Sequence, residues 1–337
     1  MTLDHAALAT RIRNGERRAL ARAITLVEST RPDHRRSAES LLERLLPDTG
    51  QSVRIGITGV PGVGKSSFIE AFGQFVIGQG HKVAVLAIDP SSRRTGGSIL
   101  GDKTRMEMLS RHHEAFIRPS PAGATLGGVA RRTREAMLLC EAAGFDVILV
   151  ETVGVGQSET AVADMVDLFM LLLLPSGGDE LQGIKKGIVE LADLVVVNKA
   201  DGELVNAASL AVAEYRHALS LLRCATGDWR TPVLSCSAHT GCGIAEVWAT
   251  IGRYRDSQGT SGVLLSRRSD QAAAWLWSEI RETLIESFQA HPDVHSALPE
   301  LEGRVRRGEM PPAAAAMALL KPFLAPISNG HGFNSPR

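Results

Sequence analysis

A glycine-rich stretch near residue 60 has the residue types and spacing of a phosphate-binding loop. Residues 59 to 66 read GVPGVGKS, which matches the pattern G-x-x-x-x-G-K-[ST] between a predicted strand and a predicted helix. Glycines let the backbone N–H groups curl around phosphate oxygens, while the lysine reaches the β- and γ-phosphates and the serine hydroxyl ligates Mg²⁺. A purely structural glycine-rich turn is the competing interpretation. The predicted nucleotide contacts of this loop are Gly59, Pro61, Gly62, Val63, Gly64, Lys65, Ser66 and Ser67.

A second motif, on a later predicted strand, distinguishes between the purine bases. Asn198, Lys199 and Asp201 form N-K-x-D within VVVNKAD. The carboxylate can accept two hydrogen bonds from the N1–H and 2-amino groups of guanine, whereas adenine would leave it buried and unpaired. Ser237 and Ala238, in SCSA after another strand, fit a backbone contact to the guanine carbonyl group. Asn-Lys after a strand is also an ordinary turn, but after a phosphate loop it predicts a GTP site.

Acidic residues at predicted strand ends are the expected partners of the metal ion. Glu151 ends DVILVE, where the usual residue is Asp, and the N–H of Gly154 could sense the γ-phosphate. Asp89 and Asp102 are two further candidate metal ligands, although Asp89 could merely cap a turn and Asp102 could merely cap a helix. Val155 stands where a glutamine would orient the attacking water, so we expect slow hydrolysis by the chain alone. The predicted catalytic residues are Lys65, Asp89 and Glu151, and the predicted metal ligands are Ser66, Asp89, Asp102 and Glu151.

Seven short apolar runs must position these motifs. They are VRIGIT, KVAVLAID, AFIRP, DVILVET, DLFMLLLLP, LVVVNK and PVLSCS, and helical stretches separate them. Unbroken apolar runs of this length are typical of parallel strands that are covered on both faces. The sequence therefore predicts an α/β fold with a mostly parallel sheet flanked by helices.

Helical extensions are predicted on both sides of this sheet domain. Residues 1 to 50 have helical apolar spacing that LPDTG ends, and residues 51 to 257 form the GTP-binding domain. The stretch DSQGTSG, at 256 to 262, indicates a linker, after which Ser269 would cap a long helix followed by two shorter ones. The apolar side chains of this arm, residues 258 to 325, must cover the sheet domain or form a dimer interface. Residues 326 to 337 are expected to be a flexible tail.

Composition argues against several classes of protein. The 337 residues include 37 Lys and Arg and 37 Asp and Glu, so no net charge attracts nucleic acid or an anionic membrane. The longest apolar run, LFMLLLLP, is too short to span a bilayer, and the N-terminus lacks a signal-peptide core. The cysteines include no C-x-x-C pair and are expected to be free thiols in a reducing compartment, namely Cys140, Cys224, Cys236 and Cys242. We therefore expect a cytoplasmic protein without nucleic-acid or membrane partners.

Longer blocks of sequence resemble a known family. DPSSRRTGGSILGDKTRM, ETVGVGQSE, GDELQGIKKGI and NKAD follow GVPGVGKS in this order. They are similar to blocks of the MeaB/ArgK family of P-loop GTPases, to which the methylmalonic aciduria type A protein belongs, over roughly residues 10 to 325. The resemblance implies a G domain of the SIMIBI class, an N-terminal helical extension and a C-terminal helical arm that forms a homodimer.

The same resemblance implies a function. The family chaperones adenosylcobalamin-dependent acyl-CoA mutases: GTP use gates cofactor delivery from a cob(I)alamin adenosyltransferase, and protects or reactivates the mutase. The client could be a methylmalonyl-, isobutyryl- or 2-hydroxyisobutyryl-CoA mutase. The resemblance also makes residues 177 to 186 a third switch. Its candidate residues are Asp179, Gln182 and Lys185. Arg105 is also assigned to switch and partner coupling; by its position it could contact phosphate or equally face solvent.

Cobalamin itself is expected to be held by the partners. A carrier with a lower histidine ligand would show D-x-H-x-x-G, and DVHSAL from Asp293 lacks the glycine. Two other classes stay open, namely a P-loop kinase, after an old label of the family as an amino-acid transport kinase, and a nickel-delivery GTPase. A kinase has no use for N-K-x-D. A nickel carrier normally has Cys/His clusters, and His112 and His113 are expected on different sides of a helix.

Overall fold

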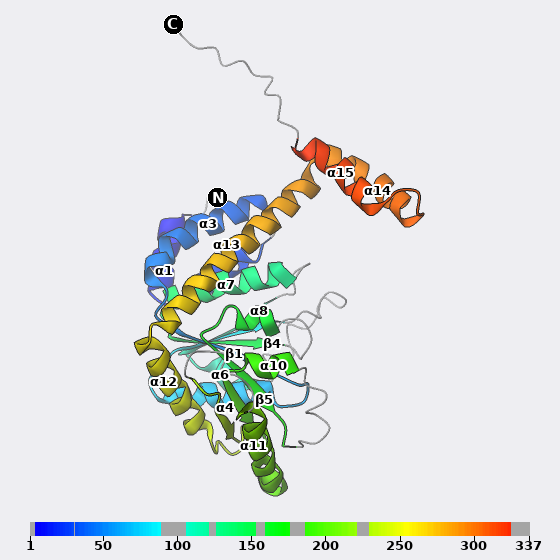
Figure 1. Ribbon diagram of the computed structural model, residues 1–337. Coiled ribbons are helices and arrows are strands. Elements are labelled where there is room, and N and C mark those ends of the chain that lie inside the picture. The colour runs from blue at the N-terminus through cyan, green and yellow to red at the C-terminus, as the bar shows by residue number, and fades with distance from the viewer. Residues whose placement is uncertain are drawn as a thin grey trace. The chain divides into compact units, whose positions relative to one another are not determined.

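A computed structural model describes residues 4–29, 31–88, 106–120, 126–152, 159–175, 186–220 and 229–324 (Figure 1). The chain divides into two compact units, Met1–Ala273 and Ala274–Arg337. The first unit holds the sheet and all the described motif residues. Within the described ranges, no helix is both long and apolar enough to cross a membrane.

A seven-stranded sheet organises the first unit. Its strand order is β3-β2-β4-β1-β5-β6-β7, and every neighbouring pair is parallel. All seven predicted strands are therefore confirmed. Their bounds are β1 Val53–Gly59, β2 Val83–Ile88, β3 Ala115–Ser120, β4 Val147–Thr152, β5 Leu168–Leu173, β6 Leu194–Val197 and β7 Val233–Ser235.

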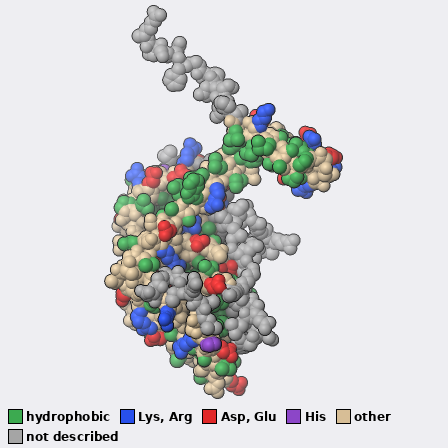
Figure 2. Space-filling view, in the orientation of Figure 1, with side chains coloured by type: hydrophobic (Ala, Val, Ile, Leu, Met, Phe, Trp, Pro, Cys, Tyr) green, Lys and Arg blue, Asp and Glu red, His purple; other side chains and the backbone are tan. Residues whose placement is uncertain are grey.

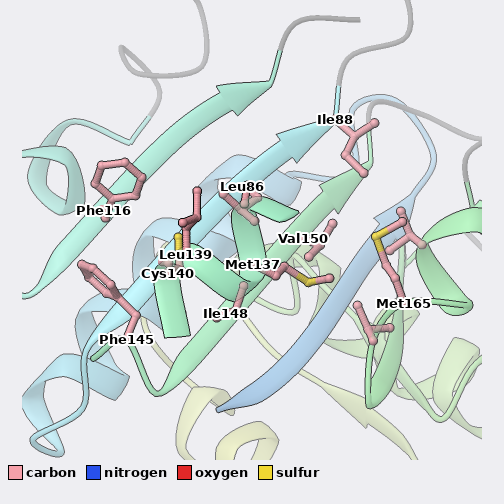
Figure 3. Packing of buried hydrophobic residues seen from close by; sticks show 14 of the residues in the cluster. Leu86, Ile88, Phe116, Met137, Leu139, Cys140, Phe145, Ile148, Val150 and Met165 are labelled. Atoms are coloured by element: carbon pink, nitrogen blue, oxygen red, sulfur yellow. The ribbon is translucent and has the colours of Figure 1, made fainter. Parts of the chain in front are cut away.

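Helices cover both faces of this sheet, as the unbroken apolar strands predict. One face packs against α4 (Lys65–Gly78), α6 (Glu107–Arg111) and α12 (Ile244–Thr260). The other packs against α7 (Leu126–Ala142), α8 (Glu159–Ala163), α10 (Lys186–Leu191) and α11 (Val205–Ser220). On that face, Met137 and Leu139 of α7 lie over Leu86, Ile148 and Val150 (Figure 3). The sheet and the helices on its two faces thus form an α/β core with two apolar layers, as predicted.

Three helices precede the first strand and confirm the helical prediction for the N-terminus. They are α1 (His5–Arg13), α2 (Arg17–Val27) and α3 (Pro32–Leu45), and the 3₁₀ turn η1 (Leu46–Asp48) ends the group. The side chain of Asp4 caps α1 by accepting from the N–H groups of Ala6 and Ala7, each at 3.0 Å. The apolar faces of these helices continue the core layer over α7. Arg118 of β3 pairs with Glu28, which follows α2, and so ties the helices to the sheet edge.

The predicted linker at 256 to 262 is wrong for most of its length. Residues 256 to 260 form the last turns of α12, and only Ser261 and Gly262 separate it from α13 (Val263–Ala290). Gln258 is 3% exposed, so packing holds these small polar residues in a helix. The predicted cap is also displaced, because α13 begins six residues before Ser269 and that residue lies inside the helix.

The second unit contains the rest of α13 together with α14 (Pro292–Arg306) and α15 (Pro312–Leu324). Both later helices were predicted, although α14 begins earlier than its sequence signal. Phe288 of α13 packs edge-on against Phe323 of α15, with ring centres 5.4 Å apart. Large apolar side chains gather along α13 on the visible face (Figure 2). Within this unit, the large apolar residues of α13 that are more than a third exposed are Leu276, Trp277, Ile280, Leu284 and Ile285.

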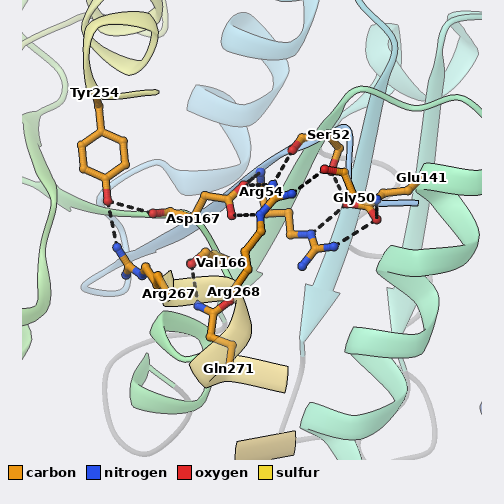
Figure 4. A network of polar contacts seen from close by, with 10 residues as sticks. All are labelled: Gly50, Ser52, Arg54, Glu141, Val166, Asp167, Tyr254, Arg267, Arg268 and Gln271. Carbon is orange, nitrogen blue, oxygen red and sulfur yellow. Dashed lines mark hydrogen bonds and ion pairs between the residues drawn. The ribbon is translucent and has the colours of Figure 1, made fainter. Parts of the chain in front are cut away.

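An arginine near the start of α13 anchors this helix to the strands (Figure 4). Arg268 donates to the two carboxylate oxygens of Asp167 at 2.7 and 2.6 Å, and to the backbone oxygen of Ser52 at 2.7 Å. Asp167, which is 3% exposed, also accepts from the backbone N–H of Arg54 in β1 at 2.9 Å. Charge-assisted bonds of this kind are the stronger ones in proteins. The contact therefore joins α13 to the beginnings of β1 and β5.

The preceding arginine repeats the arrangement one strand further along the sheet. Arg267 donates to the carboxylate of Asp193 at 3.1 Å and to the hydroxyl oxygen of Tyr254 at 2.8 Å. Asp193, just before β6, also accepts from the backbone N–H of Phe169 in β5 at 2.9 Å. Two adjacent arginines thus neutralise two buried carboxylates at the amino ends of the strands, whereas the motif residues lie at the carboxyl ends.

Replacing Arg268 with glutamine should lower the free energy of unfolding by about 2–4 kcal/mol, because it leaves the buried carboxylate of Asp167 without its charged partner. Urea unfolding at constant m-value measures this change. Arg253→Gln is the matched control, since Arg253 and its partner Glu246 have side chains that are 58% and 55% exposed. That pair should contribute less than about 1 kcal/mol. Equal losses in the two variants would contradict the anchoring role.

Candidate nucleotide-binding site

The predicted phosphate loop connects β1 to α4 at the end of the central strand. Its glycines are required by space as well as by backbone conformation. A Cβ at Gly59 would lie 2.5 Å from the backbone oxygen of Leu172 in β5. Gly64 has φ +88°, and a Cβ there would lie 3.0 Å from Nδ2 of Asn198. The loop therefore lies directly against β5 and against the end of β6, where the base motif begins.

The lysine of this loop lies at the first residue of α4 and turns back over the loop. Its Nζ donates to the backbone oxygens of Gly59 at 2.7 Å and Val60 at 3.3 Å. Burial lowers the pKa of Lys65, while the carboxylates of Glu151 and Glu159 act in the opposite direction. The ammonium group therefore lies among loop carbonyls and within the field of two acidic side chains.

The predicted metal ligands Ser66 and Glu151 are neighbours. The hydroxyl of Ser66 donates to Oε1 of Glu151 at 3.2 Å. The parallel pairing of β1 with β4 brings this about, because Ile57 is in register with Glu151 just before the loop. A hydroxyl and a carboxylate are the hard oxygen ligands that Mg²⁺ prefers, so this pair fits the ion. Ser66 and Glu151 would hold it, and the ion would neutralise phosphate charge when bound.

The base motif lies at the end of β6. Among the described residues, Lys199 is the only one other than glycine with a left-handed backbone, at φ 60°. Such a conformation is costly for a lysine and tends to occur at functional sites. The Ser237 hydroxyl donates to the Asp201 carboxylate, and the backbone N–H of Ala200 donates to the oxygen of Cys236 at 2.9 Å. The N-K-x-D motif and the predicted SCSA contact thus form one surface.

The side chain of Asn198 joins this surface to the phosphate loop. It is buried, and its Nδ2 donates to the backbone oxygen of Val63 at 2.9 Å. Its Oδ1 accepts from the backbone N–H of Ala238 at 3.2 Å. Three segments that are far apart in the sequence therefore meet at one side-chain amide, at the carboxyl ends of parallel strands.

Several predicted residues lie outside the described part of the chain. These are Asp89, Asp102, Arg105, Gly154, Asp179, Gln182 and Lys185, together with Val155 and Cys224. The third-switch segment, residues 177 to 186, is described only at its last residue, where α10 begins. Their predicted roles stay predictions.

Some residues of the site were not predicted from the sequence. Glu159 is 3% exposed at the start of α8 and favours the charged form of Lys65. It ends the block ETVGVGQSE, but no role at the site was predicted for it. Thr152 donates to the hydroxyl oxygen of Thr58 at 2.8 Å beneath the loop, and both side chains are fully buried. Only the alignment of β1 with β4 brings this pair together. The apolar strand pattern alone treats both residues as ordinary strand positions.

The expectation for the two adjacent histidines is wrong. His112 and His113 follow α6 instead of lying inside a helix, and their rings stack with centres 4.8 Å apart. The chain becomes extended at His112, with ψ 136°, so the two histidines are not successive positions of one helix.

Comparison with known proteins gives consistent relatives over nearly the whole chain. The family model "Methylmalonyl Co-A mutase-associated GTPase MeaB" matches residues 20–293. The chain is 59% identical over 321 residues to a putative GTPase of Caulobacter vibrioides, which covers 95% of this chain and 98% of that protein. It is 51% identical over 326 residues to the mitochondrial methylmalonic aciduria type A homolog of Mus musculus, covering 94% of this chain and 79% of that protein.

A solved structure supports the same relationship in three dimensions. The crystal structure of LAO/AO transport system kinase has a TM-score of 0.74 to this chain at 40% identity, covering 96% of this chain and 99% of that one. The matched family model spans all seven strands, the phosphate loop and the base motif. This chain therefore belongs to the MeaB family of methylmalonyl Co-A mutase-associated GTPases.

Proposed function

We propose that this chain is a GTP hydrolase that gates the delivery of adenosylcobalamin to a cobalamin-dependent acyl-CoA mutase and protects or reactivates that mutase. The single observation that supports it most is the buried amide of Asn198, which joins the phosphate loop to the predicted guanine surface. One ligand that carries both phosphates and a guanine would contact both segments. Membership in a family of mutase-associated GTPases supports the choice of ligand and of partner.

The proposed roles follow from the chemistry of each side chain. Lys65 would bind phosphate oxygens, and Ser66 with Glu151 would hold Mg²⁺. Asp201, oriented by the Ser237 hydroxyl, would accept from the N1–H and 2-amino groups of guanine. Catalysis of phosphoryl transfer consists mostly of positioning and charge neutralisation, which are the tasks of these groups.

The partner is proposed to be methylmalonyl-CoA mutase or a related isobutyryl- or 2-hydroxyisobutyryl-CoA mutase, with a cob(I)alamin adenosyltransferase as the source of cofactor. The cobalamin would be held by these partners. One relative is named for methylmalonic aciduria and the family model for mutase association, which supports this choice. Val155 occupies the position at which a glutamine would orient the attacking water. The mutase would therefore speed hydrolysis by ordering a switch.

The kinase alternative is supported by the name of the solved relative, LAO/AO transport system kinase. A kinase would need a pocket for a phosphate acceptor, and Asp201 would have no task in it. Guanine selectivity is therefore the property that separates the two proposals.

Asp201→Asn should weaken GTP binding at least about 100-fold, because it removes the pair of acceptor oxygens for the base. It should raise affinity for xanthosine triphosphate, whose 2-oxo group can accept from the new amide. Competition calorimetry with the two nucleotides measures both effects. Asp256→Asn, an exposed carboxylate on α12, is the matched control and should change neither affinity. If the native chain binds ATP as tightly as GTP, guanine selectivity is wrong.

The exposed apolar side chains of α13 support a homodimer through the helical arm. Light scattering should give the native chain a mass of twice 36.0 kDa, and Leu284→Glu should reduce it towards the single-chain value. A charged side chain in an apolar interface is costly because it loses its water. Leu210→Glu, at an exposed leucine of α11, is the control and should leave the mass unchanged. A native chain of single-chain mass would rule out the dimer.

Hydrolysis by the chain alone should be slow, and the holo-mutase should accelerate it by about 10³-fold or more. Single-turnover hydrolysis with and without methylmalonyl-CoA mutase is the measurement. Gln182→Ala and Lys185→Ala should remove the stimulation while GTP affinity stays near native, whereas Lys65→Ala should remove tight binding. Fast hydrolysis without the partner, or full stimulation of both switch variants, would show that this coupling is wrong.

A further inference from the structure

A third group also contacts the Asn198 amide that joins the two loops. The thiol of Cys236 lies 3.6 Å from Oδ1 of Asn198, beside the N–H of Ala238 that bonds to the same oxygen. Both Asn198 and Cys236 are only 1% exposed, so water does not compete for these bonds. Oδ1 thus has two donors from the guanine-side segment, while Nδ2 has one acceptor in the phosphate loop.

These partners allow only one orientation of the amide. The carbonyl of Val63 only accepts and the N–H of Ala238 only donates, so exchanging Oδ1 and Nδ2 would leave both unpaired. Nδ2 also fills the space beside Gly64, where a Cβ would approach it to 3.0 Å. A tilt of the amide would therefore displace the backbone at Val63 and Gly64, the part of the loop that turns towards phosphate.

Cys236 is itself held rigidly. Its backbone N–H donates to the oxygen of Val197 at 2.8 Å, and its own oxygen accepts from the N–H of Ala200 at 2.9 Å. Burial raises the pKa of the thiol to about 12, and Cys242 adds to this shift. The thiol therefore stays protonated at neutral pH and keeps its hydrogen for donation.

We propose that Cys236 is a positioning residue for nucleotide binding, whose S–H group donates to Oδ1 of Asn198 and so keeps the phosphate loop aligned with the guanine surface. This inference rests on the nucleotide binding of the proposed function. Without the thiol, Oδ1 keeps one backbone donor, the amide can tilt, and nucleotide leaves faster. The effect should be moderate because a thiol is a weak donor.

A plain packing role is the competing explanation, since Cys236 also belongs to the apolar cluster with Ile244 and Val247. Two substitutions separate the explanations because they rank in opposite order. Cys236→Val fills the space with apolar atoms but cannot donate a hydrogen bond. Cys236→Ser donates more strongly but places a hydroxyl among apolar side chains.

The measurement is the release of a fluorescent N-methylanthraniloyl GDP from the full chain, followed by stopped flow after adding excess GDP. Cys236→Val should release it about 3- to 10-fold faster than the native chain, which is the range of one modest hydrogen bond. Cys236→Ser should stay within about twofold of native. Cys242→Ser, at the exposed cysteine of the same loop, is the matched control and should not change release. Should Cys236→Val unfold in a thermal melt, Cys236→Ala takes its place.

The reverse order, with serine faster than valine, would overturn the proposal in favour of packing. Valine at the native rate would also overturn it. A native chain that binds no guanine nucleotide would instead refute the proposed function, so the two failures are distinguishable.

A double-substitution cycle tests whether Cys236 acts through Asn198. In an Asn198→Ala background, Cys236→Val should change nucleotide release less than about 1.5-fold, because the amide that it orients is gone. The same 3- to 10-fold acceleration in both backgrounds would show that the thiol acts by another route.

Discussion

Close approach of the phosphate loop to the neighbouring strand ends is the constraint on which the arrangement of the motifs depends. At Gly59 a side chain would collide with the backbone of β5, and at Gly64 it would press on the amide of Asn198. Because β1 lies between β4 and β5, the loop at its end can contact both Glu151 and the end of β6. A side chain at either glycine would move the loop away from both.

At the amino ends of the strands, opposite the motif residues, ion pairs hold the sheet to α13. Asp167 and Asp193 each accept from a backbone N–H of the adjacent strand, and consecutive arginines of α13 neutralise them. Buried carboxylates without such partners would be strongly destabilising. The beginnings of β1, β5 and β6 are thus fixed by one short segment of α13, while their other ends lead into the loops of the site.

The two ends also differ in how their polar groups are used. At the amino ends, Arg267 bonds to a carboxylate and a hydroxyl group of the protein, and Arg268 bonds to a carboxylate and a backbone oxygen. At the carboxyl ends of the strands, Lys65, Ser66 and Asp201 are only partly buried, so they are accessible to a ligand. They bond to carbonyl groups of the phosphate loop, to Glu151 of β4 and to Ser237, respectively. This contrast agrees with the general placement of ligand sites at the carboxyl ends of parallel strands.

The seven strands, the helical character of both ends and the family could be predicted from the sequence, because short apolar runs and continuous motifs are local features. The sequence predicted neither the helical continuation of α12 over residues 256 to 260 nor the start of α13 before Ser269. Packing decided both, since Gln258 is buried and Arg267 and Arg268 bond to strands that are far away in the chain. The convergence of Val63, Asn198 and Ala238 on one amide likewise depends on strand order, which local patterns do not encode. These contacts depend on how the chain folds in three dimensions, because they join residues that are 40 and 135 positions apart.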